Sequence, residues 1–289
     1  MSHHHVPDAV EPKSLDIQHD TDPEQDHGLA RRIPHMGHAM LFFSLAWMLV
    51  SASALVIFSL AHLHQDSLAL HPGFVLMAQA LAYVLILALS FWLFPHLWEV
   101  SFLQGIHWGM LAARRNWYWI VAGGVVLSAA AQACLYFLPQ PKTTPFDQLL
   151  TSPSSGWILA AFAVVVAPIT EEIAFRGFLL PALATAYDWL ALERSPAGLE
   201  RWERSTQHSA SALVFAAIFS SVPFVLLHAD QLSHAWGILG VLFGVSLALS
   251  FVRIRTHSVA CSTLLHATYN FTIFAVTLVS TGGFRHLGR

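Results

Sequence analysis

The residues of this sequence best suited to chemistry lie in one short stretch, 170–177, which reads TEEIAFRG. Its two carboxylates and one guanidinium, from Glu171, Glu172 and Arg176, stand within an apolar run that covers 157–186. An ionisable side chain at the centre of a membrane helix costs roughly 2.5–3.5 kcal/mol on insertion scales. Such residues face a protein interior or a wet cavity and are typically functional, so this stretch is the first candidate for a site.

The spacing within the stretch separates the two glutamates. Glu172 and Arg176 stand at i and i+4, so they can pair along one face of a helix. Glu171 is rotated by about 100° from Glu172, because an α-helix has roughly 3.6 residues per turn. One carboxylate therefore has a cation close by, and Glu171 is left without one. A carboxylate so placed has the properties that a general base needs.

Two further polar pairs occur in later apolar runs. Phe224 and His228 stand at i and i+4, which lets the aromatic ring pack on the imidazole and fix its rotamer. His266 and Asn270 share that spacing, which places two hydrogen-bonding side chains on one helix face. A single histidine in a membrane helix is as often a packing residue as a functional one. Two histidines, an asparagine and a Glu-Glu pair on three separate helices favour a common site.

The depth of these residues along their helices tests that interpretation. At about 1.5 Å per residue, Glu171 lies about 15–22 Å from the end of its helix, and His266 about 12 Å from the start of its own. His228 comes out at about 27 Å from Ala210 on the same rise. Of the candidate residues, His228 therefore fits a common layer least well.

The chemistry that this set favours is the activation of water. A carboxylate in a water-poor site can take a proton from water near neutral pH, and an imidazole can share that proton or pass it to a leaving amine. An asparagine beside a second histidine can stabilise the oxyanion of a tetrahedral intermediate. The alternative is a catalytic zinc ion held by Glu171, His228 and His266, which have the donor types of an open zinc site. The spacing leaves both alternatives open, and the sequence has no HExxH motif.

The composition places these motifs in a membrane protein. Of 289 residues, 55% are hydrophobic and 11% are charged, whereas soluble domains carry about 25% charged residues. Repeated apolar runs approach the ~20 residues that an α-helix needs to cross a bilayer. The formal net charge of −3 gives no support for nucleic-acid binding. We expect membrane lipids to be the chain's immediate partners.

The sequence predicts an all-α fold, a polytopic membrane helix bundle of about seven transmembrane helices, with an eighth left open among the weaker segments. Residues 1–35, rich in histidine and acidic residues, are predicted to form a disordered cytoplasmic tail. Residues 36–289 form the transmembrane domain, whose motif-bearing core is 157–274. The predicted spans are 39–61, 73–94, 117–138, 157–186, 210–229, 236–253 and 258–281.

The basic residues predict how the chain sits in the membrane. With seven spans, several arginines fall on one side, while the opposite loops before the C-terminal tail contain Lys142 alone. By the positive-inside rule, we expect a multi-pass protein of the cell membrane with a cytoplasmic N-terminus. The arginines on the predicted cytoplasmic side are Arg31, Arg32, Arg114, Arg115, Arg201, Arg204, Arg253 and Arg255.

The three motifs carry a family resemblance. Glu-Glu-x-x-x-Arg at 171–176, Phe-x-x-x-His at 224–228 and His-x-x-x-Asn at 266–270 follow in this order on apolar runs. In this they resemble the CPBP family, which comprises CAAX prenyl proteases of the Ras-converting type and bacteriocin-processing or self-immunity proteins, also called the ABI family.

The resemblance implies an intramembrane endopeptidase that acts on a membrane-associated or lipidated peptide or protein, with a site that opens to the cytoplasm. It implies that Glu171 activates water and that Glu172 with Arg176 holds the first motif together. It also implies that His228 positions or shares the proton, with Phe224 in support. By the same resemblance, His266 and Asn270 form the oxyanion pocket. The family has been described both as zinc-dependent and as glutamate-dependent; we favour the metal-free mechanism, with no cofactor, because Glu171 is free and Asn270 suits an oxyanion better than zinc.

Two other classes of function compete with the protease. One is a non-catalytic membrane scaffold or immunity protein of the same fold, which would have no need to keep Glu171, His228, His266 and Asn270 together. The other is a transporter or proton relay that uses buried glutamate and histidine. The sequence shows no paired halves of the kind on which many transporters are built, which counts against this class.

Overall fold

The structure, a computed structural model, describes residues 32–62, 72–141, 144 and 153–285. Throughout these ranges the regular structure is helical, which confirms the predicted all-α membrane bundle. Residues 1–31 of the predicted tail lie outside the described residues. The helices are α1 (Met36–Leu60), α2 (Pro72–Trp98), α3 (Phe102–Gly105), α4 (Met110–Tyr136), α6 (Pro153–Ala161), η3 (Phe162–Val166), α7 (Ala167–Glu172), η4 (Ile173–Leu179), α8 (Leu180–Leu190), α9 (Pro196–Arg204), α10 (Ala210–Leu226), α11 (Trp236–Thr256) and α12 (Val259–Ser280).

Seven apolar helices in the described residues correspond to the seven predicted spans. Six are long and apolar enough to cross a membrane, and α10 is a shorter apolar helix. Large apolar side chains point outward from them, as lipid-facing residues do; Trp47 is 75% exposed and Trp119 is 68% exposed. The boundaries differ from the prediction by up to four residues, except that α4 begins at Met110 instead of 117.

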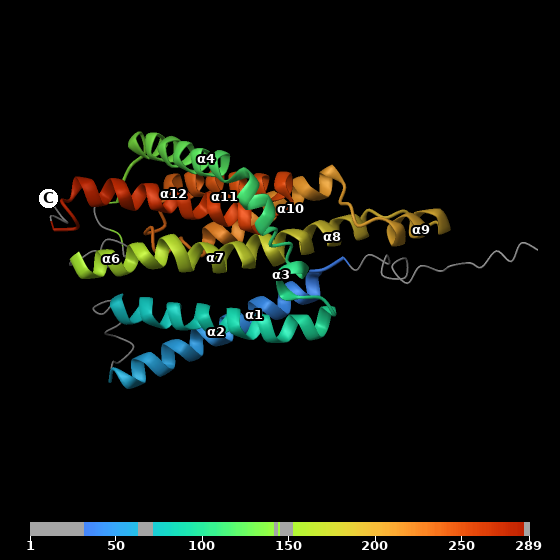
Figure 1. The fold of residues 1–289 in the computed structure, drawn as a ribbon, viewed down its shortest axis with the longest axis horizontal. Coiled ribbons are helices and arrows are strands. Elements are labelled where there is room, and N and C mark those ends of the chain that lie inside the picture. The colour runs from blue at the N-terminus through green and yellow to red at the C-terminus, as the bar shows by residue number, and fades with distance from the viewer. Residues whose placement is uncertain (1–31, 63–71, 142–143, 145–152, 286–289) are drawn as a thin grey trace, which may run out of the picture.

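The bundle has two parts, which run side by side in Figure 1. The α1–α2 hairpin forms one part, and α4, α10, α11 and α12 with the long helix α6–α8 form the other. Aromatic rings join them: Phe42 of α1 stacks on Phe178 of η4 with centroids 4.4 Å apart, and Phe94 of α2 lies 4.7 Å from the same ring. Such contacts bury much apolar area and fix the position of the hairpin against the long helix.

The close approach of α4 to α12 depends on a glycine. A Cβ added to Gly124 would stand 2.7 Å from Cβ of Thr268 and 3.0 Å from the carbonyl oxygen of Leu265. Only a residue without a side chain fits there, and small residues at such crossings are typical of membrane helices. The helix that carries the third motif is therefore held tightly by its neighbour.

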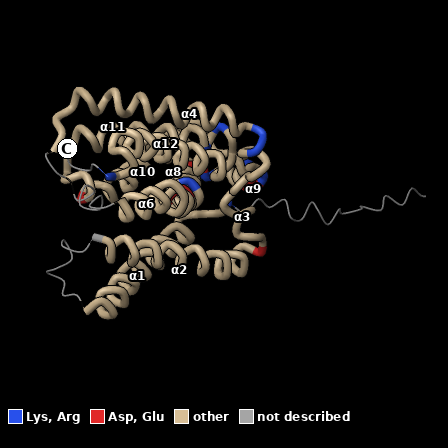
Figure 2. The backbone as a smooth tube through the Cα atoms, turned by 60° about the vertical axis from the view of Figure 1, so that its left-hand side comes forward, with Lys and Arg blue, Asp and Glu red and all other residues tan. Residues whose placement is uncertain are grey.

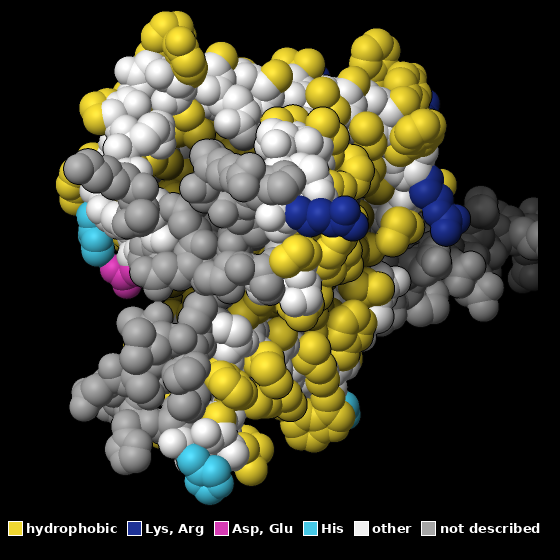
Figure 3. Space-filling model, turned by 90° about the vertical axis from the view of Figure 1, so that its left-hand side faces the viewer, with side chains coloured by type: hydrophobic (Ala, Val, Ile, Leu, Met, Phe, Trp, Pro, Cys, Tyr) yellow, Lys and Arg dark blue, Asp and Glu magenta, His cyan; other side chains and the backbone are white. Residues whose placement is uncertain are grey.

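Lys and Arg are most concentrated at one end of the bundle, which we call the basic end (Figure 2). It includes Arg114 and Arg115 at the start of α4, Arg255 at the end of α11, and α9 with Arg201 and Arg204. Figure 3 looks onto the opposite end, where hydrophobic side chains predominate.

The chain enters the bundle at the basic end through residues 32–35, which were predicted to belong to the tail. Arg32 stacks on Trp202 of α9, 3.5 Å from the ring centroid, and donates a hydrogen bond to the carbonyl of Ser205. His35 caps the N-terminus of α1.

The long helix from α6 to α8 is interrupted by two π-helical segments. In η3 and η4 the backbone hydrogen bonds span five residues instead of four; Ala167 N–H, for example, donates to the carbonyl of Phe162. Each π turn accommodates an extra residue and so rotates the next part of the helix about its axis, and such turns are frequent at functional sites. The α-helical turn between them, α7, carries Glu171 and Glu172.

Candidate active site

The first motif contains a fully buried ion pair. Glu172 Oε1 lies 3.0 Å from Arg176 Nη1, and the two side chains are 0% and 1% exposed. Nη2 of Arg176 also donates to the carbonyl and the hydroxyl of Ser246 on α11, at 2.7 and 2.8 Å. The pairing predicted from the i, i+4 spacing is therefore present, and it ties the long helix to α11.

Phe224 of the second motif brings the three motifs together. Its ring lies below the guanidinium of Arg176, with Cζ 4.7 Å from the centroid, which is a cation–π distance. The same ring is 5.0 Å from His228 and 6.0 Å from His266, between ring centroids. The predicted contact of Phe224 with His228 is present, and the two further contacts join helices that are distant in sequence.

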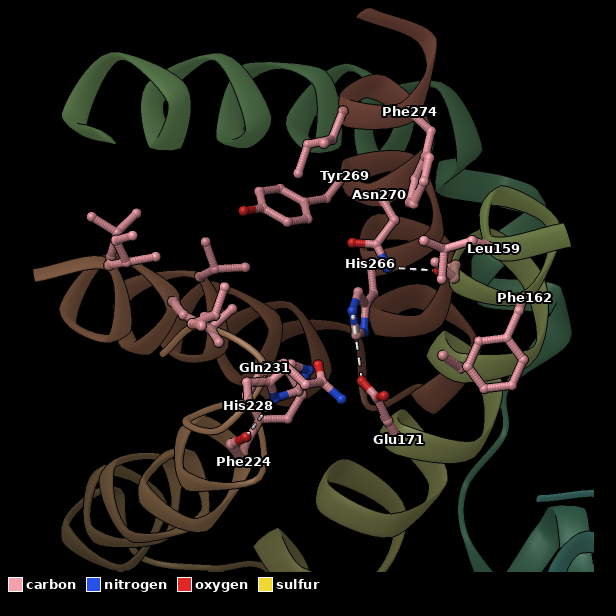
Figure 4. A pocket seen from close by; sticks show the side chains of 18 of the residues that line it. Leu159, Phe162, Glu171, Phe224, His228, Gln231, His266, Tyr269, Asn270 and Phe274 are labelled. Atoms are coloured by element: carbon pink, nitrogen blue, oxygen red, sulfur yellow. Dashed lines mark hydrogen bonds and ion pairs between the residues drawn. The ribbon is translucent and has the colours of Figure 1, made fainter. Parts of the chain in front are cut away.

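His266 lies between the two glutamates. Its Nδ1 donates to Glu172 Oε1 at 3.1 Å, and its Nε2 is 3.9 Å from Glu171 Oε2. Because Glu172 is held by Arg176, the bond at Nδ1 fixes the orientation of the imidazole. His266 therefore connects the buried ion pair to the carboxylate that Figure 4 shows beside it.

His228 is not on a helix, although the predicted span included it. The helix α10 ends at Leu226 and the chain turns, so His228 lies in the turn after it. Its Nδ1 donates to the carbonyl of Phe224 at 2.9 Å, since a carbonyl can only accept. Each imidazole is thus held at Nδ1, by a carbonyl in one case and a carboxylate in the other, and keeps Nε2 for other contacts. Despite the depth mismatch inferred from the sequence, His228 lines the same cavity as Glu171 and His266.

Asn270 is bound to the wall of the site. Its amide Nδ2 donates to the carbonyl of Ala163 in η3 at 2.7 Å, drawn as a dashed line in Figure 4. The amide nitrogen must face this oxygen, because a carbonyl accepts and cannot donate. One N–H of Asn270 is thereby occupied, and the other N–H and Oδ1 remain for a ligand. The predicted oxyanion role stays a prediction that uses the remaining N–H.

A cavity of about 730 Å³ brings most of the predicted residues together. Glu171, Phe224, His228, His266 and Asn270 line it, whereas Glu172 and Arg176 lie behind its wall. The rest of the lining is mainly apolar and comes from α2, α4, α6, η3, α11 and α12. A site that is apolar with a few converging polar groups is the usual form of a binding or active site.

The cavity extends away from the basic end. Its lining includes Val75 near the start of α2, Leu135 near the end of α4 and Ile238 near the start of α11, all at the opposite end of the bundle. The sequence had predicted a cytoplasmic N-terminus at the basic end and, through the family resemblance, a site open to the cytoplasm. Because the cavity extends to the end opposite the basic end, a cytoplasmic basic end and a site open to the cytoplasm are not compatible with each other.

Four polar lining residues were not named from the sequence: Gln79, Gln132, Gln231 and Tyr269. Gln231, three residues after His228, presents its amide near Glu171 in Figure 4, and Tyr269 precedes Asn270. The predicted helix ended at 229, so Gln231 fell in the connector after it, where no motif marked it as a site residue.

The alternative zinc set does not form a ligand group. Among the described residues, no three histidine, cysteine or acidic side chains are arranged to hold a metal ion. Glu171 and His266 are neighbours, but His228 does not complete a group with them. The three residues therefore do not fit the open three-ligand zinc site described for metalloenzymes.

Comparison with known families agrees with the site. Residues 153–272 match the family model of the Rce1-like type II CAAX prenyl endopeptidases, and this range contains all three motifs. Over these residues the chain is similar to the Rce1-like family of CAAX proteases. No curated protein and no solved structure matches the chain.

The matched region runs from the start of α6 into α12 and contains most of the residues that line the cavity. The family recognised from the sequence is thereby confirmed. With its apolar helices, the chain is a multi-pass membrane protein, and residues 153–272 match a protease family.

Proposed function

We propose that the chain is an intramembrane endopeptidase that hydrolyses a peptide bond of a membrane-associated or lipidated substrate with water activated by Glu171. The observation that carries the proposal is the position of Glu171 in an otherwise mainly apolar cavity, with Nε2 of His266 3.9 Å from its carboxylate. A water molecule placed against both groups would have a base and a hydrogen-bond partner. Such positioned acid–base groups contribute typically 10²- to 10⁴-fold to a rate.

The proposed reaction conserves protons. Glu171 takes a proton from water as the oxygen attacks the carbonyl carbon, and the C=O electron pair moves to oxygen. His266 and the remaining N–H of Asn270 stabilise that oxyanion. The C–N bond then breaks, and the proton passes from Glu171, directly or through His228, to the leaving nitrogen.

The charges of the site suit this role. Glu171, Glu172 and Arg176 together carry a net charge of −1, so one proton shared between Glu171 and His266 makes the group neutral. Burial of a neutral group costs far less than burial of a net charge. The site is therefore able to hold one transferable proton in surroundings that contain little water.

We also propose that the substrate reaches Glu171 from the end of the bundle opposite the basic end. The cavity lining extends to that end, and the positive-inside rule makes the basic end cytoplasmic. In a variant without Cys134 and Cys261, a cysteine at Gln140 should then react with a membrane-impermeant maleimide from outside the cell, and one at Arg115 should not. The reverse pattern would refute this orientation.

The activity is tested by cleavage of a panel of membrane-anchored and lipidated peptides by protein reconstituted in vesicles. Wild type should cleave at least one substrate class, and Glu171→Gln should lower kcat by roughly 10²- to 10⁴-fold without loss of folded protein. If Glu171→Gln cleaved as fast as wild type, the assignment of the base would be wrong. Partner capture with no cleavage by wild type would favour the scaffold.

A further inference from the structure

The contact that holds Asn270 depends on an unusual backbone acceptor. In an α-helix the carbonyl of Ala163 would accept the N–H of Ala167, but here that N–H bonds to Phe162 instead, in the five-residue register of η3. In that register the donor for Ala163 would be residue 168. Residue 168 is proline, which has no N–H. The backbone of the long helix therefore supplies no donor to this carbonyl in either register.

The side chain of Asn270 donates to the carbonyl of Ala163 in place of a backbone N–H. Its Nδ2 lies 2.7 Å from the oxygen of Ala163, although the two residues are 107 positions apart in the chain. A partly buried carbonyl without a partner would cost free energy, so the pairing satisfies both groups. It also fixes the plane of an amide that lines the cavity, at a distance of one helical turn from His266 on α12.

We propose that Pro168 is a positioning residue for Asn270. Because Pro168 has no N–H to donate within the π turn, the carbonyl of Ala163 stays available as an acceptor at a fixed position. This acceptor holds the Asn270 amide in one orientation toward the cavity. A hydrogen-bond donor that is already oriented before the reaction stabilises the charge that develops in the transition state without having to rotate first. This preorganisation is what lowers the barrier. The effect on catalysis rests on the proposed function, whereas the contact itself does not.

Pro168→Ala is the direct test, because it returns an N–H to position 168 and removes the ring that opposes an α-helical register. The sequence contains only two asparagines, Asn116 and Asn270, so labelling with ¹⁵N-asparagine yields two side-chain amide signals. Asn116 donates to the carbonyl of Ala112 at 2.9 Å and is an internal reference. Asn270→Asp assigns the second signal by its loss.

We expect Pro168→Ala to shift the Asn270 amide signal away from its hydrogen-bonded position and to speed its proton exchange, while the Asn116 signal stays unchanged. The matched control is Pro95→Ala, which removes another intrahelical proline, near the far end of α2 and outside the cavity lining. Pro95→Ala should leave both signals unchanged. An Asn270 signal identical in wild type and Pro168→Ala would overturn the proposal, whether or not the protein is a protease.

The kinetic readout separates positioning from simple structural support. Pro168→Ala should lower kcat about tenfold with little change in KM, the equivalent of one hydrogen bond. The melting temperature should not fall, because alanine is far better tolerated than proline inside a helix. A fall in melting temperature that accompanies the loss of rate would show that Pro168 acts only in folding, and the proposal would be rejected.

Discussion

Glu171 and Glu172 are adjacent in the chain, yet only Glu171 reaches the cavity. Glu172 is fully buried behind the wall, between Arg176 and His266, whereas the Glu171 side chain is 13% exposed and lines the cavity. Their separation follows from the roughly 100° turn between consecutive helical residues. One carboxylate is thereby available for chemistry, and the other holds together the groups that position it.

Glu172→Gln should destabilise the protein far more than Glu171→Gln does. The substitution leaves Arg176 buried without its counter-ion and takes the carboxylate from His266. Removal of one partner of a buried ion pair typically costs 3–5 kcal/mol. Thermal unfolding in detergent or nanodiscs measures the difference. Equal stability of the two variants would contradict the division of roles between the glutamates.

Cleavage should survive the removal of divalent metals. The described residues contain no group of three potential ligands, and the proposed mechanism uses only Glu171, the two histidines and Asn270. Incubation with a chelator and then the cleavage assay should therefore leave kcat unchanged. A loss of activity that zinc restores, and magnesium does not, would establish the metal mechanism instead.

The parts of the fold that are local in sequence were predictable. Apolar runs of bilayer length located the seven helices, because hydrocarbon thickness sets their length. The Glu172–Arg176 pair followed from i, i+4 spacing in the same way. The start of α4 was missed because Arg114 and Arg115 resemble a boundary, although long basic side chains can extend from a helix end toward the interface.

The long-range contacts of the site could not be derived from the sequence. The bond from His266 to Glu172 spans 94 positions, and the Arg176–Ser246 contacts span 70. No periodicity encodes such pairs, since they depend on how separate helices pack. The π turns were missed for a related reason, because a proline such as Pro168 predicts only a kink, and a kink does not specify which carbonyl is left open.

Gly124→Ala should weaken the contact of α4 with α12, whereas Gly123→Ala should not. The added methyl at Gly124 would meet Thr268 at 2.7 Å, whereas at Gly123 it would have only a tolerable 3.4 Å contact with Leu265. Overpacking of this kind typically costs 1–3 kcal/mol. Unfolding measurements on the pair test this, and a shifted α12 should also slow cleavage. Equal stability of the two variants would show that α4 does not hold α12 at this crossing.

Stability should decline in mild acid through His208, which lies between α9 and α10. Its Nδ1 donates to Asp188 at 2.9 Å, but burial, the larger influence, lowers the pKa of His208 below its ordinary 6.5, and Arg32 and Arg253 lower it further. A histidine with a lowered pKa in the folded state contributes stability that is present above about pH 6.5 and is lost as the pH falls. His208→Asn retains a donor for Asp188 but cannot titrate. Melting temperatures between pH 7.5 and 5.5 should therefore fall less steeply for this variant than for wild type, and parallel profiles would exclude His208 as the source of the pH dependence.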